Sequence, residues 1–166
     1  MELFMEKIVK RKKTGLDVAI VTGEITAAVV LGLAAFILIP QIGMFLAVGL
    51  GYGAWYLVGL RNLEFEYALT NGDLDIDRIQ ARRKRKRIFS AHGKEFELVA
   101  PVRSAYYSNE LKALKKVIDA SAGKDAEGVW FILTHIGGER GVVLFQPTSG
   151  MIDSLWHVNP RKVMRS

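Results

Sequence analysis

The sequence predicts an α-helical membrane hairpin followed by a cytoplasmic domain of antiparallel strands that one helix completes. Three observations predict this fold class. Residues 25–60 form 36 consecutive positions without a charged side chain. Apolar and polar residues alternate from Leu63 onward, which is typical of half-buried strands. Residues 82–87 are all Arg or Lys, which marks the cytoplasmic side of a membrane protein.

The composition excludes several protein classes. The chain has 166 residues, of which 50% are hydrophobic and 24% charged, and its formal net charge is +6. A mean hydropathy of +0.17 at that charge content requires apolar residues to be segregated, which disfavours an ordinary soluble domain. Disordered proteins have low hydrophobicity, so disorder is excluded. Because the chain has no cysteine, a disulfide framework and thiolate zinc sites are excluded as well.

The uncharged segment is too long for a single membrane crossing. About 20 helical residues span a bilayer core, and 36 would extend roughly 54 Å. Pro40 and Gln41 break the segment near its middle. We therefore expect two transmembrane helices, Val18–Ile39 and Ile42–Leu60, in a hairpin over residues 16–61. A cleaved signal peptide is the alternative, but a second span follows at once and no small-residue cleavage site precedes a polar start.

Basic residues flank the hairpin at both ends and are absent from its turn. Lys7 and residues 10–13 precede the first helix, and Arg61 and the run 82–87 follow the second. The positive-inside rule then predicts a multi-pass protein of the cell membrane with both termini in the cytoplasm. Residues 1–15 form an amphipathic N-terminal segment, and residues 1–13 suit a helix lying on the inner membrane surface.

Small residues recur within the hairpin. Gly43, Ala47 and Gly51 lie on one face of the second helix and are predicted to be helix-packing residues. They pack either against the first helix of the same chain or against another copy, and the sequence leaves both open. Glu24 lies about 9 Å inside the first helix. We interpret it as a carboxylate near the headgroups and close to the N-terminal lysines, with an ion path as the alternative.

Period-two patterns and turn residues divide residues 62–166 into about seven strands. Asn71-Gly72 is a strong hairpin signal, and Gly137-Gly138 predicts a second tight turn. The expected strands are 63–67, 74–77, 85–90, 95–99, 116–121, 129–136 and 141–146. A helical turn is expected at 108–113 and a helix at 148–157, which Pro147 precedes.

The segment Glu66–Ile79 carries a Tyr, a Thr-Asn-Gly turn and a Leu-x-Ile-x-Arg-Ile strand. It resembles the opening of bacterial pleckstrin-homology-like domains. Together with the basic run and the closing Asn159–Lys162, the chain resembles small bacterial membrane proteins of unknown function. The resemblance implies an α+β/all-β pleckstrin-homology-like barrel of about seven antiparallel strands, whose open end the C-terminal helix covers. It implies no activity and no catalytic residues.

The basic run dominates the charge of the cytoplasmic domain. Residues 62–166 hold 17 basic and 13 acidic side chains, and without the run the basic count falls to 11. Basic clusters beside a membrane helix attract anionic lipids. The predicted lipid-binding residues are Arg82, Arg83, Lys84, Arg85, Lys86 and Arg87. One alternative is a solvated run that only sets the membrane topology. Another is nucleic-acid binding, although no set of stacking aromatic residues accompanies the run.

No pattern predicts catalysis, a metal or a cofactor. Asp73, Asp75 and Asp77 imitate a calcium loop, but Arg78 occupies the position that requires Gly. The three histidines lack ligand spacing. We therefore expect no enzyme but a membrane-anchored lipid- or protein-binding module. The alternative is a structural subunit that assembles through its hairpin, as a homo-oligomer or with a protein partner.

Overall fold

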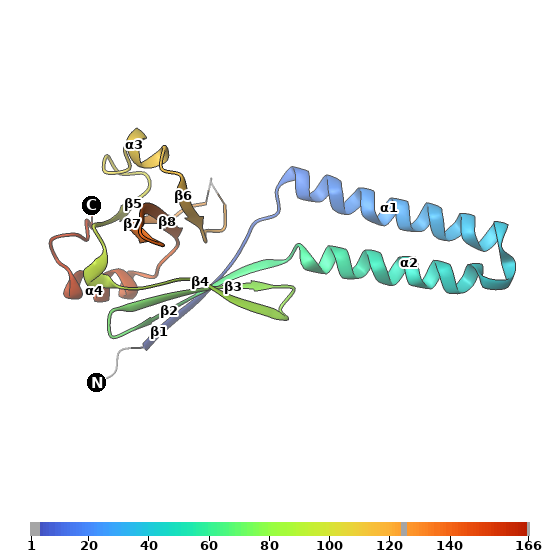
Figure 1. The fold of residues 1–166 in the computed structure, drawn as a ribbon, viewed down its shortest axis with the longest axis horizontal. Helices are drawn as coiled ribbons and strands as arrows, with labels where there is room; N and C mark the ends of the chain where they lie inside the picture. Colours follow the sequence, from blue (N-terminus) through green and yellow to red (C-terminus); the bar gives the residue numbers. More distant parts are fainter. Residues whose placement is uncertain (1–3, 124–125, 166) are drawn as a thin grey trace. The chain divides into compact units, whose positions relative to one another are not determined.

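The computed structural model describes residues 4–123 and 126–165, which form two compact units (Figure 1). The hairpin unit contains residues 12–63 and 80–82. The strand unit contains residues 4–11, 64–79 and the described part of 83–165. The chain therefore leaves the strand unit after its first strand and re-enters it after the hairpin.

The hairpin unit consists of α1 (Gly15–Leu38) and α2 (Pro40–Leu60). Helix α1 begins three residues earlier than predicted because Thr14 and Asp17 form a reciprocal capping box. Helix α2 begins at Pro40 rather than Ile42, because a proline at the first helical position lacks only an N–H that would be unpaired anyway. Both helices are long and apolar enough to cross a membrane, and the most apolar window of each is only 6% buried.

The strand unit contains two four-stranded sheets and the C-terminal helix α4 (Ser149–Val158). The first sheet has the order β1-β2-β3-β4, and the second has the order β5-β7-β8-β6. The strands are β1 (Phe4–Lys10), β2 (Leu63–Thr70), β3 (Asp73–Gln80), β4 (Lys84–His92), β5 (Leu98–Pro101), β6 (Lys116–Asp119), β7 (Trp130–Ile136) and β8 (Glu139–Phe145). A short 3-10 turn, η1 (Gly93–Glu95), and α3 (Asn109–Lys112) complete the described elements.

The seven strands expected after the hairpin are all present, as β2 to β8. They form two sheets rather than one barrel, and the pairing is not antiparallel throughout as predicted. Strand β6 pairs in parallel with β8, from Lys116 opposite Gly141 to Asp119 opposite Leu144. Strands β6 and β7 follow each other in the chain, but β8 lies between them in the sheet. The connection from β6 to β7 is therefore a crossover, which parallel pairing requires.

The prediction of a helix at residues 1–13 is wrong over Phe4–Lys10, which form strand β1. This strand pairs antiparallel with β2, with Ile8 opposite Glu66. Val9 is 8% exposed and joins the core, whereas its neighbour Ile8 is 51% exposed. The segment is amphipathic, but its alternation has a period of two, and the open edge of β2 decides which periodicity is realised. Residues 1–3 of the predicted segment lie outside the described residues.

The predicted Asn-Gly turn joins β2 to β3. Asn71 and Gly72 have φ angles of 51° and 94°, which fits the left-handed conformation that this dipeptide favours in hairpins. Gly72 is required for a second reason, because a Cβ there would lie 2.8 Å from the Val158 side chain of α4. The turn is thus also a packing contact for the C-terminal helix.

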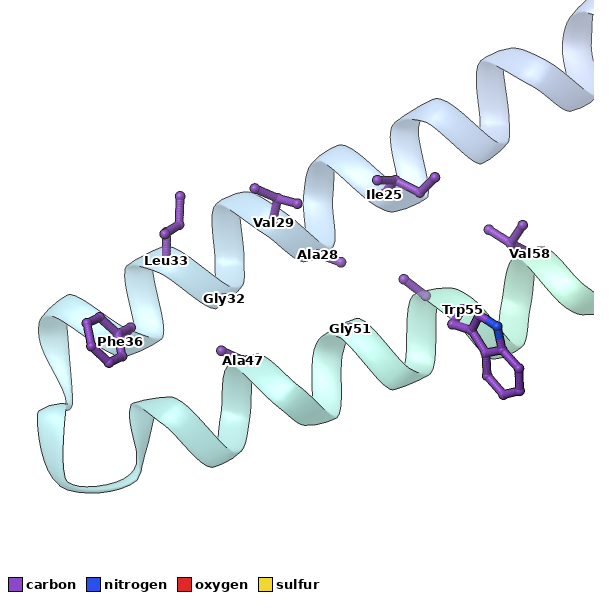
Figure 2. Close-up of a pocket in the computed structure, with 11 residues that line it drawn as sticks. Ile25, Ala28, Val29, Gly32, Leu33, Phe36, Ala47, Gly51, Trp55 and Val58 are labelled. Carbon is purple, nitrogen blue, oxygen red and sulfur yellow. The ribbon is translucent and has the colours of Figure 1, made fainter.

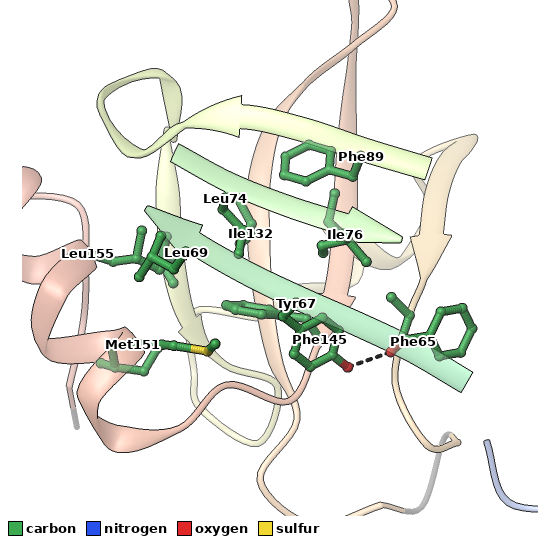
Figure 3. Packing of buried hydrophobic residues seen from close by; sticks show 14 of the residues in the cluster. Phe65, Tyr67, Leu69, Leu74, Ile76, Phe89, Ile132, Phe145, Met151 and Leu155 are labelled. Carbon is green, nitrogen blue, oxygen red and sulfur yellow. Dashed lines mark hydrogen bonds between the residues drawn. The ribbon is translucent and has the colours of Figure 1, made fainter. Parts of the chain in front are cut away.

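The main core lies among both sheets and α4 (Figure 3). Tyr67 and Phe145 meet edge to face with ring centroids 5.9 Å apart. Met151 and Leu155 of α4 are almost fully buried against this core. A second cluster covers the other face of the β5-β7-β8 sheet, where Leu111 of α3 packs with Phe131. Both faces of the second sheet are therefore buried.

Candidate functional site: the basic turn and the helix hairpin

The turn between β3 and β4 is hydrogen bonded to the end of α2. The Gln80 side chain donates to the Leu60 carbonyl oxygen at 2.9 Å. The Ala81 amide donates to the Asn62 carbonyl oxygen, also at 2.9 Å. Carbonyl groups at a helix C-terminus lack partners within the helix, so these donors satisfy them. The contact places the start of the basic run beside the end of an apolar helix.

The backbone of this turn is strained. Ala81 and Arg82 have φ angles of 54° and 55°, in the left-handed region that non-glycine residues rarely adopt. Such conformations persist where surrounding contacts stabilise them. The hydrogen bond between Ala81 and Asn62 is one such contact. The start of the basic run is therefore held in one conformation at the helix end.

Two of the six predicted lipid-binding residues are engaged in ion pairs within the first sheet. Arg85 pairs with Glu66 of β2 and, at 3.5 Å, with Asp77 of β3. Arg87 pairs with Asp75 at 2.7 Å and also with Asp77. The hydrogen bond from Arg87 to Asp77 is the main cause that raises the pKa of Arg87 above its ordinary value. Asp77 is only 8% exposed, so these cations neutralise a buried carboxylate.

Between Arg87 and Phe89, the side chains of β4 change which face of the first sheet they occupy. Arg87 contacts the carboxylates of β3, whereas Phe89 is buried in the main core. Strict alternation would place residues two apart on the same face. Ile88 and Phe89 both pack on the core, so the alternation shifts by one residue there. This shift lets the basic half of β4 face the acidic residues while its apolar half faces the core.

All six cations of the run are exposed, and the other four differ in their surroundings. Arg82 and Arg83 interact with other groups of the protein. Lys84 and Lys86 form no ion pair with any residue in 4–123 or 126–165. The continuous basic run of the sequence therefore contains two arginines paired with carboxylates, two arginines with other contacts, and two lysines that form no ion pair among the described residues.

The two helices of the hairpin are joined by an ion pair between Glu24 and Arg61. The Arg61 Nη2 atom lies 2.6 Å from Glu24 Oε1, and Nε lies 3.5 Å from Oε2. The Arg61 side chain is 31% exposed and the Glu24 side chain is 21% exposed. The sequence placed Glu24 near the N-terminal lysines, but Arg61 is its partner. The two residues are 37 positions apart and meet only because α1 and α2 pack antiparallel. No local sequence pattern reveals this pair.

The three predicted helix-packing residues have different surroundings (Figure 2). A Cβ on Gly43 would lie 2.6 Å from the Phe36 Cα atom and closer still to the Ala35 carbonyl oxygen. Ala47 lies against Gly32 of α1, where an added Cβ would be 3.5 Å from Ala47. An added Cβ on Gly51 would have no neighbour within 4 Å. The helices are thus closest at the turn and diverge toward Gly51.

That divergence opens an apolar groove between α1 and α2. The groove has a volume of about 550 Å³, and Figure 2 shows Ala47 and Gly51 of α2 on the side toward Ala28 and Gly32 of α1. Its described lining also includes Trp55, which is 59% exposed. The lining is almost wholly hydrocarbon, which suits an acyl chain or an apolar helix and not a polar ligand.

Two of the three aspartates and two of the three histidines considered for metals have other partners. Asp75 and Asp77 bind Arg87, as described above. His92 accepts a hydrogen bond from the Lys94 amide, and His135 lies 3.4 Å from Glu97. These contacts give each residue a structural role in the strand unit.

Comparison with a family described as Bacterial PH-like domain (DUF6106) gives a match over residues 1–165. No curated protein matches the chain, and no solved structure matches it. The family match covers the hairpin and both sheets, and it agrees with the resemblance of Glu66–Ile79 and its surroundings. The chain belongs to the bacterial PH-like domain family.

Proposed function

We propose that the hairpin anchors this protein in a membrane and that the strand unit acts there as a binding module, without catalysis. The pairing of β1 with β2 carries the argument. These strands flank the hairpin in the chain and are hydrogen-bonded neighbours in one sheet. The chain must therefore enter and leave the membrane on the same side, which requires an even number of crossings. Two exposed apolar helices supply that number.

The distribution of charge supports the cytoplasmic side for the strand unit. Lys12, Lys13, Arg61 and Arg82 all belong to the ends of the hairpin unit that join the strands. The opposite end, at Ile39 and Pro40, has no Lys or Arg. Positive residues are retained in the cytoplasm during membrane insertion. Both termini are then cytoplasmic and only the turn is external.

We further propose that the solvent-exposed part of the basic run contacts anionic headgroups. The turn that carries Arg82 is hydrogen bonded to the end of α2, which would lie at the inner surface of the bilayer. Each cation near an anionic surface contributes about 1 kcal/mol. Arg85 and Arg87 contribute less, because neighbouring carboxylates offset their charge.

The topology is tested in intact cells with single cysteines at Gln41 and Lys94, since the natural chain has none. A membrane-impermeant thiol reagent should label Gln41→Cys from outside and label Lys94→Cys only after lysis. Labelling of Lys94→Cys in intact cells would place the strand unit outside and contradict the proposal.

Headgroup contact is tested on the full chain in nanodiscs that mix phosphatidylcholine and phosphatidylglycerol. Trp55 lies five residues before the end of α2, and it reports on nearby lipid once Trp130 and Trp156 are replaced by Phe. Brominated phosphatidylglycerol should quench its fluorescence more than brominated phosphatidylcholine at equal mole fraction. Lys84→Gln/Lys86→Gln should reduce the difference, and raised salt should reduce it too. Equal quenching by both lipids without the lysine substitutions would refute headgroup contact.

A second candidate function is assembly through the hairpin, which the uncovered groove at Gly51 favours. An apolar helix of a second copy would fill the groove and approach α2 closely at a residue without a side chain. Gly51→Cys should then form a disulfide-linked dimer under mild oxidation in membranes, whereas Gly49→Cys, at a glycine with equal space that does not line the groove, should not. If each of the two variants stays monomeric, headgroup binding remains as the proposed function.

A further inference from the structure

Strand β4 ends the first sheet, and its outer edge is open. The order β1-β2-β3-β4 leaves one side of β4 without a strand. Residues 84–87 are all exposed, and Figure 3 shows β4, with Phe89, as the strand beyond Leu74 and Ile76. Among the described residues, the backbone of 84–87 makes no hydrogen bond outside the sheet. Such an edge presents N–H and C=O groups that can pair with an added strand.

Another edge of the domain is closed by the chain itself. At β5, the Val99 amide donates to the Lys162 carbonyl oxygen and the Met164 amide donates to the Val99 carbonyl oxygen, both at 2.8 Å. The C-terminal segment thus forms a parallel bridge along that edge. By contrast, the outer edge of β4 combines an open backbone with four consecutive cations, Lys84–Arg87.

The charges on β4 define what could add to this edge. Arg85 and Arg87 lie on the face that carries Glu66, Asp75 and Asp77, so charge alternates across the sheet from acidic to basic. An acidic residue on the next strand would continue that alternation. Lys84 and Lys86 occupy the intervening positions, where successive side chains point to the opposite face. Cations therefore line both faces of the edge.

We propose that the outer edge of β4 binds an extended acidic segment of a partner protein by strand addition. Backbone hydrogen bonds would supply the pairing, as in other domains that accept a peptide at a sheet edge. Acidic residues at consecutive positions would meet cations on both faces, and those opposite Lys84 and Lys86, which form no ion pair among the described residues, would gain most. The same cations repel a basic strand, and charged side chains on an edge disfavour unspecific pairing in general.

This inference does not depend on headgroup binding or on the membrane topology. A lipid headgroup uses only the charge of the run, whereas a strand uses both the charge and the backbone. Blocking the backbone amides of an acidic peptide therefore weakens its binding if it adds as a strand. It has no effect if the cations recognise charge alone. The experiment uses neutral lipid so that no anionic headgroup competes with the peptide.

The full chain in phosphatidylcholine nanodiscs is titrated with a fluorescent eight-residue peptide that has four central glutamates between Val-Thr flanks. Two further peptides carry N-methyl groups on the odd or on the even amides, which leaves their charge unchanged. Because alternate amides of a strand face the same side, one methylated peptide should bind about tenfold more weakly and the other should bind normally. Hydrogen exchange of the β4 amides should slow on binding of the unmodified peptide.

Variants locate the site. Lys84→Glu/Lys86→Glu should weaken binding of the glutamate peptide by about tenfold or more, because like charges face each other. The matched control Lys94→Glu/Lys115→Glu makes the same charge change at exposed residues outside β4 and should bind normally. Equal binding of all three peptides, with displacement by phosphatidylglycerol vesicles, would assign the cations to headgroups and overturn strand addition. No binding of the unmodified peptide would overturn it as well.

Discussion

Arg61, the residue that ends α2, turns its guanidinium back along the hairpin to Glu24 of α1, at 2.6 Å. The two charges satisfy each other where both side chains are partly covered, with 31% of Arg61 and 21% of Glu24 exposed. An unpaired charge inside a bilayer is costly, whereas a paired one is tolerated. The pair also fixes the relative position of the two helices at the end opposite their turn. It accounts for the acidic residue inside an otherwise apolar helix without an ion path.

Arg61→Gln should therefore destabilise the hairpin more than Glu24→Gln/Arg61→Gln does. The single variant leaves the Glu24 carboxylate without its partner, so its melting temperature should fall below that of the natural chain and of the double variant. The double variant replaces the pair with neutral side chains. Thermal unfolding in neutral micelles measures both. A double variant less stable than the single one would show that the pair is not the reason for the loss.

Gly43→Ala should destabilise the hairpin, whereas Gly51→Ala should not. The added methyl group at Gly43 meets the backbone of Ala35 and Phe36, which cannot move without separating the helices. Overpacking of this kind costs about 1–3 kcal/mol. Gly51 has space for a methyl group. The comparison is made by thermal unfolding of the two monomers in the same detergent, and similar losses would contradict the closest approach at Gly43.

Val9→Asp should unfold the strand unit, and Ile8→Asp should be tolerated. The two residues are neighbours in β1 but face opposite sides, and only Val9 contacts the core. A buried unpaired carboxylate costs several kcal/mol, unlike one at the surface. Limited proteolysis and circular dichroism measure the outcome. Equal tolerance of both variants would mean that residues 4–10 do not pair as a strand in solution.

Arg87→Gln should destabilise the strand unit, in contrast to Lys86→Gln. Loss of Arg87 removes the shared partner of Asp75 and Asp77, and Asp77 is buried. We expect a loss of about 1–3 kcal/mol for Arg87→Gln and less than about 0.5 kcal/mol for Lys86→Gln. Chemical denaturation of the two full-length variants gives the comparison. Equal stability would show that the carboxylates do not need the arginine.

Tyr67→Phe should destabilise the strand unit at neutral pH, and the deficit should shrink above about pH 10. The Tyr67 hydroxyl donates to the Ala120 carbonyl oxygen at 2.6 Å and accepts from the Gln146 amide at 3.3 Å. Loss of these bonds costs about 1–2 kcal/mol. Burial raises the pKa of Tyr67 well above its ordinary value. The unfolded chain then loses the phenolic proton first, so natural stability falls as pH rises.

Stability is measured by denaturant titration from pH 7 to pH 11, with the natural chain and the Phe variant side by side. Tyr107, whose pKa burial also raises, is present in both and does not affect the difference. A deficit that stays constant or grows above pH 10 would contradict the assignment of Tyr67 as a neutral buried hydrogen-bond donor.

Local patterns alone predicted most elements of this protein. The uncharged segment 25–60 and Pro40 predicted both apolar helices to within three residues at each end. Alternation and the Asn71-Gly72 turn predicted β2 and β3, and seven strands were expected where β2 to β8 lie. The resemblance at Glu66–Ile79 predicted a family to which the chain does belong. Helix periodicity, strand periodicity and turn conformation each depend on residues a few positions apart. Local sequence patterns are therefore enough to predict these elements.

The sequence by itself determined which segments are apolar, which alternate and where the positive charges lie. Only the tertiary structure decided that residues 4–10 form a strand on β2, that Arg61 is the partner of Glu24, and that Arg85 and Arg87 are neutralised while Lys84 and Lys86 are not. Each of these outcomes joins groups at least eight residues apart. An amphipathic segment or a charge has several acceptable partners, and the partner is selected by which surfaces the rest of the chain leaves open when its core packs.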